Sequence, residues 1–311
     1  MHCCKCLGAA LLLSCSVLSD KLPTERPHLT GLAHIAIYAH DFEKSKVFYR
    51  DFLGFAEPYS LNNPDGSPSM TFFKINERQY LELSPEKEAN SDRLRHISFE
   101  TDDIEGLRSY LESKGVKVPS ATSRGRIGNR SFNITDPAGH TVEMVQYMPD
   151  GWTIRERGKS LGATHISQRM MHAGIIVTDL KAEYQFYTEI LGFKEIWRGS
   201  KSGTELSWVN LKLPDSDDYV EFMLYKDAPP PTQRGGAHHL CLQVSNIDES
   251  VAALKTKPSE LYGHPMEIRL GVNRKRQCNL FDPDGTRTEL MEPRTVDGKV
   301  TPSSSAPPPS Y

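Results

Sequence analysis

Four histidines and four glutamates recur in this 311-residue sequence at a nearly constant spacing. Each His is followed by a Glu 47 to 50 residues later; the pairs are His34 and Glu82, His96 and Glu143, His172 and Glu221, and His239 and Glu289. Imidazole and carboxylate groups together suit a borderline divalent ion such as Zn, Ni, Co, Mn or Fe(II). Two such pairs that converge would give one site of two His and two Glu. The spacing therefore predicts a metal-dependent protein with two sites.

The segments that carry these residues are copies of two patterns. The first begins at His34 and again at His172, and it continues into an amphipathic helix that ends in Phe-Tyr-x-x-x-Leu-Gly-Phe (48–55 and 186–193). The second begins at His96 and again at His239, continues into helices expected over 105–114 and 249–257, and closes on Asp-Pro-x-Gly, with Glu seven residues after the Asp. Self-similarity of this kind indicates repeated structural units.

Each unit reads as a strand, a helix and then several strands with alternating apolar residues. Four βαβββ units predict an α+β protein in which pairs of units form two domains with curved, mostly antiparallel sheets. The expected boundaries are 29–148 for the first domain, 149–169 for a linker, 170–293 for the second domain and 294–311 for a disordered tail rich in Pro and Ser.

Composition narrows the class of protein. A formal net charge of −3 gives no general attraction to nucleic acid, so a small-molecule substrate is the expected partner. No apolar run reaches the roughly 20 residues of a membrane-spanning helix. Residues 1–19 resemble a secretory leader, and Cys15 offers an alternative as the lipid anchor of a lipoprotein. We therefore expect an exported protein, periplasmic, membrane-anchored or secreted, that is a monomer or a homodimer.

These motifs resemble the vicinal oxygen chelate superfamily, which includes glyoxalase I, methylmalonyl-CoA epimerase, extradiol dioxygenases and bleomycin-resistance proteins. The resemblance covers about residues 29–293. It implies paired βαβββ modules and a metal ion that binds substrate through two adjacent oxygens. Relatives pair their modules in different ways, so each site could also form between the first and fourth units and between the second and third.

The glyoxalase and epimerase branch, by resemblance, uses four protein ligands and a glutamate that moves a proton next to a carbonyl. This sequence offers the full ligand set in both halves, with Glu143 and Glu289 at the place of the family's base. We therefore expect lyase or isomerase chemistry.

Two alternatives stay open. One is an Fe(II)-dependent extradiol dioxygenase that uses His172, His239 and Glu289. Extradiol enzymes carry a His and a Tyr in the hairpin before the terminal Glu, and here those places hold Arg274 and Asn279. The other is a non-catalytic binding protein of the resistance type.

The same hairpins are basic in both halves. Arg126 in the first and Arg274 in the second are candidates to bind a carboxylate or phosphate on the substrate, because a guanidinium binds such groups with two hydrogen bonds. The histidines outside the register, including His140 and His238, are expected at the surface, although His238 adjoins His239 and a one-residue slip would exchange them.

Overall fold

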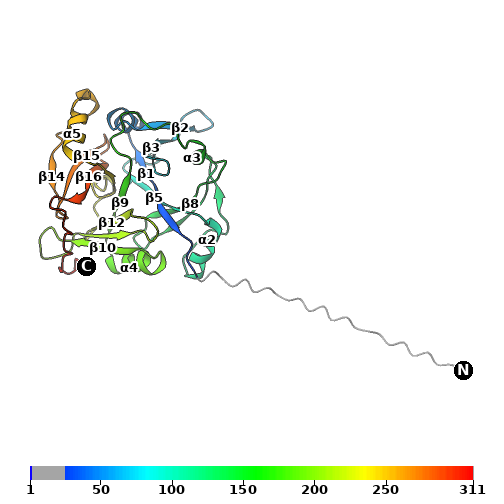
Figure 1. The fold of residues 1–311 in the computed structure, drawn as a ribbon. Helices are drawn as coiled ribbons and strands as arrows, with labels where there is room; N and C mark the ends of the chain where they lie inside the picture. Colours follow the sequence, from blue (N-terminus) through cyan, green and yellow to red (C-terminus); the bar gives the residue numbers. More distant parts are fainter. Residues whose placement is uncertain (2–24, 311) are drawn as a thin grey trace.

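Two eight-stranded mixed sheets form the protein in the computed structural model, which describes Met1 and residues 25–310 (Figure 1). The first sheet has the order β2-β3-β4-β1-β5-β8-β7-β6, and the second repeats it as β10-β11-β12-β9-β13-β16-β15-β14. In each sheet two strand pairs are parallel, β1 with β4 and β5 with β8 in the first, and the other pairs are antiparallel. The predicted α+β fold of four βαβββ units, paired as neighbours in sequence, is confirmed.

The first half contains these elements: β1 (Leu29–Ala39), α1 (Phe42–Val47), the π-helical turn η1 (Phe48–Phe52), β2 (Ala56–Asn62), β3 (Pro68–Lys74), β4 (Tyr80–Pro85), β5 (Leu94–Thr101), α2 (Ile104–Ser113), β6 (Ser123–Arg124), β7 (Arg130–Thr135) and β8 (Thr141–Gln146). A short helix α3 (Trp152–Arg155) follows in the segment that joins the halves.

The second half repeats that order: β9 (Met170–Val177), α4 (Leu180–Gln185), the π-helical turn η2 (Phe186–Ile190), β10 (Lys194–Gly199), β11 (Trp208–Lys212), β12 (Tyr219–Leu224), η3 (Pro231–Gln233), β13 (His239–Gln243), α5 (Ile247–Lys255), η4 (Ser259–Leu261), β14 (Ile268–Leu270), β15 (Lys275–Phe281) and β16 (Arg287–Thr295).

Local sequence explains where the helices begin and end. Asp103 and Asp179 cap α2 and α4, because each carboxylate accepts a hydrogen bond from a backbone N–H of the first helical turn. The π-helical turns end at Phe52 and Ile190, and two residues later the chain turns at Gly54 and Gly192, whose φ angles of 82° and 78° suit glycine. The aromatic side chains of these turns, such as Tyr49, lie in one apolar cluster that spans both halves.

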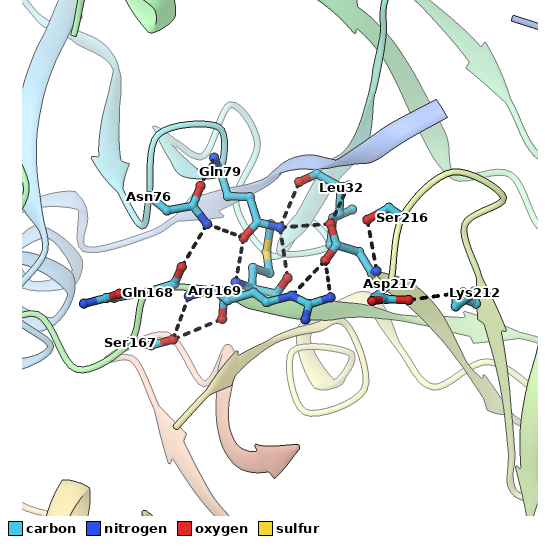
Figure 2. Close-up of polar contacts among 11 residues, drawn as sticks. Leu32, Asn76, Gln79, Ser167, Gln168, Arg169, Lys212, Ser216 and Asp217 are labelled. Carbon is cyan, nitrogen blue, oxygen red and sulfur yellow. Dashed lines mark hydrogen bonds and ion pairs between the residues drawn. The ribbon is translucent and has the colours of Figure 1, made fainter. Parts of the chain in front are cut away.

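Polar side chains join the two halves beside this apolar cluster (Figure 2). The Gln79 amide donates hydrogen bonds to the carbonyls of Leu32 and Met170, and its oxygen accepts one from the Met170 N–H. Asp218 accepts from the Leu32 N–H and from the Arg169 guanidinium. Because Leu32 and Met170 belong to β1 and β9, this network fixes the central strands of the two sheets relative to each other.

The predicted disordered tail is wrong for residues 294–310. Strand β16 extends to Thr295, and the chain then runs beside β10, the edge strand of the second sheet. There the Ser304 N–H donates to the Arg198 carbonyl, and the Pro307 carbonyl accepts from the Leu206 N–H. Composition indicated that this segment has little to bury, but its backbone groups bond to polar groups of the second half and cover a sheet edge.

The proposed leader, including Cys15, lies outside the described residues. Among the residues that the structure describes, no helix has the length and apolar character needed to cross a membrane.

Candidate metal centres

The strand order brings the sequence-predicted donors together in two groups. His34, Glu82, His96 and Glu143 lie on β1, β4, β5 and β8, which are adjacent in the sheet in the order β4-β1-β5-β8. His172, Glu221, His239 and Glu289 occupy the corresponding strands β9, β12, β13 and β16. Both groups therefore form within one half, and the alternative pairing of the first unit with the fourth does not occur.

In the first half the donor atoms lie at distances that suit a single ion. His34 Nε2 is 2.8 Å from His96 Nε2 and 3.0 Å from a Glu143 oxygen, and His96 Nε2 is 3.6 Å from that oxygen. Two atoms that each lie about 2.1 Å from one ion are separated by about 3.0 to 3.4 Å at right or tetrahedral angles. The donors of this first site thus fit a divalent metal ion.

Glu82 is the fourth predicted ligand, and it is held differently. One oxygen lies 3.8 Å from His34 Nε2, while the other accepts a hydrogen bond from Arg95. Arg95 reaches the site because the pairing of β1 with β5 shifts register between His96 and Leu94, which leaves Arg95 as the extra residue of an irregularity. Bulges of this kind redirect side chains. The first site thus consists of three close donors and one carboxylate paired with an arginine.

Protonation in the first site differs between its members. Burial lowers the pKa of His96 to about 3, so its imidazole is neutral at pH 7 and its lone pair is free to bind a metal ion. Burial raises the pKa of Glu82. Burial acts in the same direction on Glu143, but the hydrogen bond and charge of His34 outweigh it and hold the pKa of Glu143 well below its usual range. The pKa values of the two carboxylates of the site are therefore shifted in opposite directions, upward for Glu82 and downward for Glu143.

A cavity of about 380 Å³ opens directly onto the first site. His34, His96 and both glutamates are part of its lining, and so are aromatic side chains, of which Tyr59 and Tyr80 have buried hydroxyl groups without a hydrogen-bond partner. Arg126 also lines it, and donates hydrogen bonds to Ser69 Oγ and the Asn62 carbonyl. This volume accommodates a small substrate next to the donors.

The second site has an equally compact donor set. His172 Nε2 lies 3.0 Å from His239 Nε2, 3.3 Å from Glu289 and 3.8 Å from Glu221. The Nδ1 atom of His239 lies 2.7 Å from the Ala237 carbonyl, so a hydrogen bond there would direct Nε2 toward the other donors. One oxygen of Glu289 is buried without a hydrogen-bond partner. The donor atoms of these four residues all lie within 4.8 Å of one another, a group compact enough to surround one divalent ion.

The second site differs from the first in the charged residue beside it and in the shape of the neighbouring cavity. The Arg287 guanidinium lies 2.8 Å from both ring nitrogens of His239, and burial together with this charge lowers the pKa of His239 to about 3. The space corresponding to the first cavity is divided into cavities of about 340 and 500 Å³, which share Trp197 and Asn273 in their walls. Glu221 and Glu289 line the smaller one. In the second site an arginine thus contacts a histidine donor, whereas in the first Arg95 contacts the carboxylate of Glu82.

Arg274 does not take the predicted place. Its side chain bonds to Asp297 at 2.8 Å, and it lines neither cavity of the second half. It sits at the tip of the β14–β15 hairpin with a φ angle of 60°, and its neighbours Asn273 and Lys275 point into the larger cavity instead. In this turn conformation the Arg274 side chain extends toward Asp297 and away from both cavities.

Sequence reasoning also missed Arg287 and Tyr80, although a signal was present. Each lies two residues before a predicted ligand, Glu289 and Glu82, on the same strand, and residues two apart on a strand share a face. Arg95 gave no such signal, because it adjoins His96 and faces the site only through the register shift of β5. The histidines His140 and His238 are another correction, since both lie at the interface of the halves and not on the surface.

Comparison with known proteins agrees with this architecture. Residues 31–144 and 169–290 match the family model of the Glyoxalase/Bleomycin resistance protein/Dioxygenase superfamily. The match covers more than half of the sequence, and the chain belongs to this superfamily.

Individual relatives differ in their chemistry. The lactoylglutathione lyase of Schizosaccharomyces pombe is 24% identical over 309 residues, which cover 84% of this chain and 96% of the relative. The Mn(II)-bound glyoxalase of Novosphingobium aromaticivorans has a TM-score of 0.65 at 17% identity, over 91% of this chain and 89% of its own. The 2,3-dioxygenase LapB of Pseudomonas sp. KL28 also has a TM-score of 0.65, at 18% identity over 91% and 98%. The relatives support an enzyme acting on a small molecule.

Proposed function

We propose that the protein is a metal-dependent lyase or isomerase of the glyoxalase type, and that its first site carries out the reaction. The substrate would be a small carbonyl compound that offers two adjacent oxygens. One observation carries the proposal: all four donor residues of the first site line its cavity of about 380 Å³, whereas in the second site only the two glutamates line a cavity and His239 lies against Arg287. Similarity to a lactoylglutathione lyase over nearly its whole length supports the same class of reaction.

In this proposal His34, His96 and Glu143 hold a divalent cation. The cation would supply Lewis-acid polarisation of the substrate oxygens. Glu143 is ionised at neutral pH and faces the cavity, so it is available to accept a proton from the carbon next to the carbonyl. Glu82, whose charge Arg95 compensates, is the second carboxylate within reach of the same space.

Other side chains of the cavity would select the substrate. Tyr59, Phe72 and Tyr80 form an aromatic wall, which favours a flat or apolar portion. Arg126 provides a cationic group for a carboxylate or phosphate. We therefore propose an anionic carbonyl compound with an apolar portion as the substrate class.

We also propose export, on the basis of the leader-like residues 1–19. Export would argue against a glutathione adduct as the substrate, because glutathione is chiefly a thiol of the cytosol. Mass determination of the mature protein from an expressing bacterium tests this point: cleavage near residue 19, or a lipid on Cys15, would support export.

The experiment compares matched glutamate variants of the full chain, stripped by a chelator and reloaded with Zn, Ni, Co, Mn or Fe(II). Proton exchange next to the carbonyl of small 2-oxo compounds is followed by NMR in D₂O. We expect Glu143→Gln to lower the rate of proton exchange by a factor of about 10² to 10⁴. Glu289→Gln should retain most of that rate. Glu82→Gln shows whether the second carboxylate shares the proton transfer.

Three outcomes would contradict the proposal. Oxygen uptake with catechols in the Fe(II) protein, lost in Glu289→Gln, would favour the dioxygenase alternative. Tight binding of small molecules without turnover under any metal would favour a binding protein. Equal activity in Glu143→Gln and the parent would exclude the first site as the catalytic one.

A further inference from the structure

A third group of titratable side chains lies where the two halves meet, outside both His/Glu sites. Asp136 and His140 belong to the turn between β7 and β8 of the first half, and Glu183 belongs to α4 of the second. Each offers a donor atom, and these atoms all lie within 4.8 Å of one another. Asp136 is 3% exposed and Glu183 is fully buried. The interface thus contains two carboxylates and an imidazole in close contact.

The carboxylates of this cluster lack a cationic partner of permanent charge. Asp136 is 2.9 Å from His140 Nδ1 and accepts a hydrogen bond from the Tyr187 hydroxyl at 3.3 Å. One Glu183 oxygen accepts from the Ala138 N–H at 3.0 Å, and the other has no hydrogen-bond partner. Within the described part of the chain, no Lys or Arg side chain forms an ion pair with either carboxylate. Two buried carboxylates this close to each other require either a shared proton or a bound cation between them.

A second imidazole adjoins the cluster. The ring of His238 meets that of His140 edge to face, with centroids 5.3 Å apart. His238 is 2% exposed, its Nδ1 is bonded to Asp92, and its Nε2 has no partner. The cluster therefore has a further nitrogen donor at its edge.

The internal repeat supplies a comparison. Asp282 begins the second Asp-Pro-x-Gly turn as Asp136 begins the first, and it accepts a hydrogen bond from Tyr49 as Asp136 does from Tyr187. The places that correspond to His140 and Glu183 hold Thr286 and Ser45. At one of these two places the halves therefore pack with the hydroxyl groups of Thr286 and Ser45. Packing of the halves does not by itself require an imidazole and a second carboxylate such as those of His140 and Glu183.

We propose that Asp136, His140 and Glu183 form a third cation site, which binds a divalent transition-metal ion such as Zn(II) and links the two halves of the molecule. The mixed oxygen and nitrogen donors suit Zn(II) better than Ca(II) or Mg(II), which prefer oxygen ligands alone. Because two ligands come from the first half and one from the second, the ion would stabilise the packing of the halves. This site does not depend on the proposed enzymatic function.

When no cation is bound, Asp136 and Glu183 share a proton, which reduces the repulsion between the two carboxylates. Burial and the neighbouring Asp136 raise the pKa of Glu183 to about 10, so the pair carries one proton at neutral pH. Zn(II) bound to both carboxylates would displace that proton. Uptake of Zn(II) at this site is therefore expected to release protons to the buffer.

The test uses the full chain with His34→Ala and His172→Ala, which weaken the two His/Glu sites. Zn(II) binding is measured by equilibrium dialysis and calorimetry, with and without Glu183→Gln. We expect the double variant to bind one equivalent tighter than about 10 µM, and Glu183→Gln to weaken that binding at least about tenfold. Ser45→Ala, at the matching place of the other half, is the control and should change nothing.

Any Zn(II) retained at the weakened His/Glu sites would bind whether or not Glu183→Gln is present. The third site is therefore measured by the difference in Zn(II) binding between the double variant and the same protein with Glu183→Gln. A second readout is the unfolding temperature, which Zn(II) should raise in the double variant and not after Glu183→Gln. If Glu183→Gln does not fold, as judged by circular dichroism, His140→Asn replaces it. Equal Zn(II) binding with and without Glu183→Gln, or no binding in the double variant, would overturn the proposal and leave a carboxyl–carboxylate hydrogen bond.

Discussion

One residue position gives the two His/Glu sites a different local charge. Two residues before the terminal glutamate, the first half has Thr141 and the second half has Arg287, and each lines the cavity beside its donors. The scaffold around them is the same, so this exchange changes local charge without changing the donor set. At about 4 Å, unit charges near a protein surface interact by about 4 kcal/mol, and a divalent ion interacts more strongly.

We expect Arg287→Thr to increase the affinity of the second site for Zn(II) by about 10- to 100-fold, because it removes a positive charge beside His239. The measurement is competitive titration against a chromophoric chelator in a His34→Ala background. The reciprocal change, Thr141→Arg in a His172→Ala background, should weaken the first site by a similar factor. If affinity is unchanged in both variants, Arg287 does not set the difference between the sites.

The donors themselves could be predicted from the sequence because the repeat places one His and one Glu at the same register in every unit. Their grouping into one site in each half was predicted, but with a pairing between units of different halves left open, since the choice depends on which strands are neighbours in the sheet. The pairing of Glu82 with Arg95 was beyond prediction for a different reason: a shift in strand register has no signature in residue spacing. At the residue scale, then, the ligands can be predicted from the sequence, whereas the charged groups beside them can be predicted only in part.

Among the elements, the two Asp-Pro-x-Gly turns have the same backbone but different environments. Both end in a glycine with positive φ, and both place their aspartate against a tyrosine of the opposite half. Asp282 has only hydroxyl and backbone partners, and burial raises its pKa to about 6. Turn chemistry predicted the turns correctly, whereas their partners depend on the packing of the halves.

The raised pKa of Asp282 predicts a pH dependence of stability. The folded state binds this proton more tightly than the unfolded state, where the pKa is 3.8, so the contribution is stabilising below pH 4 and lost as pH rises through 6. A shift of about two units corresponds to about 3 kcal/mol. Asp282→Asn, which mimics the protonated form, should remove this part of the slope between pH 4 and 7 in urea unfolding. Identical slopes in both proteins would contradict the assignment.

The C-terminal segment is a second element with a testable role. Deletion of residues 302–311 removes hydrogen bonds to β10 and to Leu206, each of which contributes about 0.5 to 1.5 kcal/mol. We expect the unfolding temperature to fall by several degrees, as scanning calorimetry would show. An unchanged temperature would indicate that the segment contributes no stability, as a disordered tail would.

At the scale of the whole molecule, the halves are joined by side chains and by a packed connecting segment. Residues 149–169 were predicted as a linker, and their backbone is bound by a buried lysine. The Lys74 ammonium is fully buried and bonds to Glu77 and to the carbonyls of Glu156 and Lys159. Composition indicated a polar connection but not this contact, because a buried cation cannot be inferred from one lysine in a strand.

Removal of this lysine should loosen the connection. We expect Lys74→Met to lower the free energy of unfolding by about 3 kcal/mol, because the carbonyls of Glu156 and Lys159 lose their common hydrogen-bond donor. Limited proteolysis should then cut within 149–169 faster than in the parent. Lys212→Met, at an exposed pair with Asp217, is a control that should leave both measurements unchanged.

Strand pairing confined to each half has a consequence for synthesis on the ribosome. Every strand of the first sheet lies before residue 147, so that sheet can close while the second half is still being translated. Until α4 and the second Asp-Pro-x-Gly turn emerge, the Tyr49 hydroxyl lacks its partner Asp282, and Asp136 lacks the Tyr187 hydroxyl. The interface between the halves is therefore the last part of the molecule to form. A pause in translation after the first half would leave a folded first sheet whose interface with the second half is still exposed.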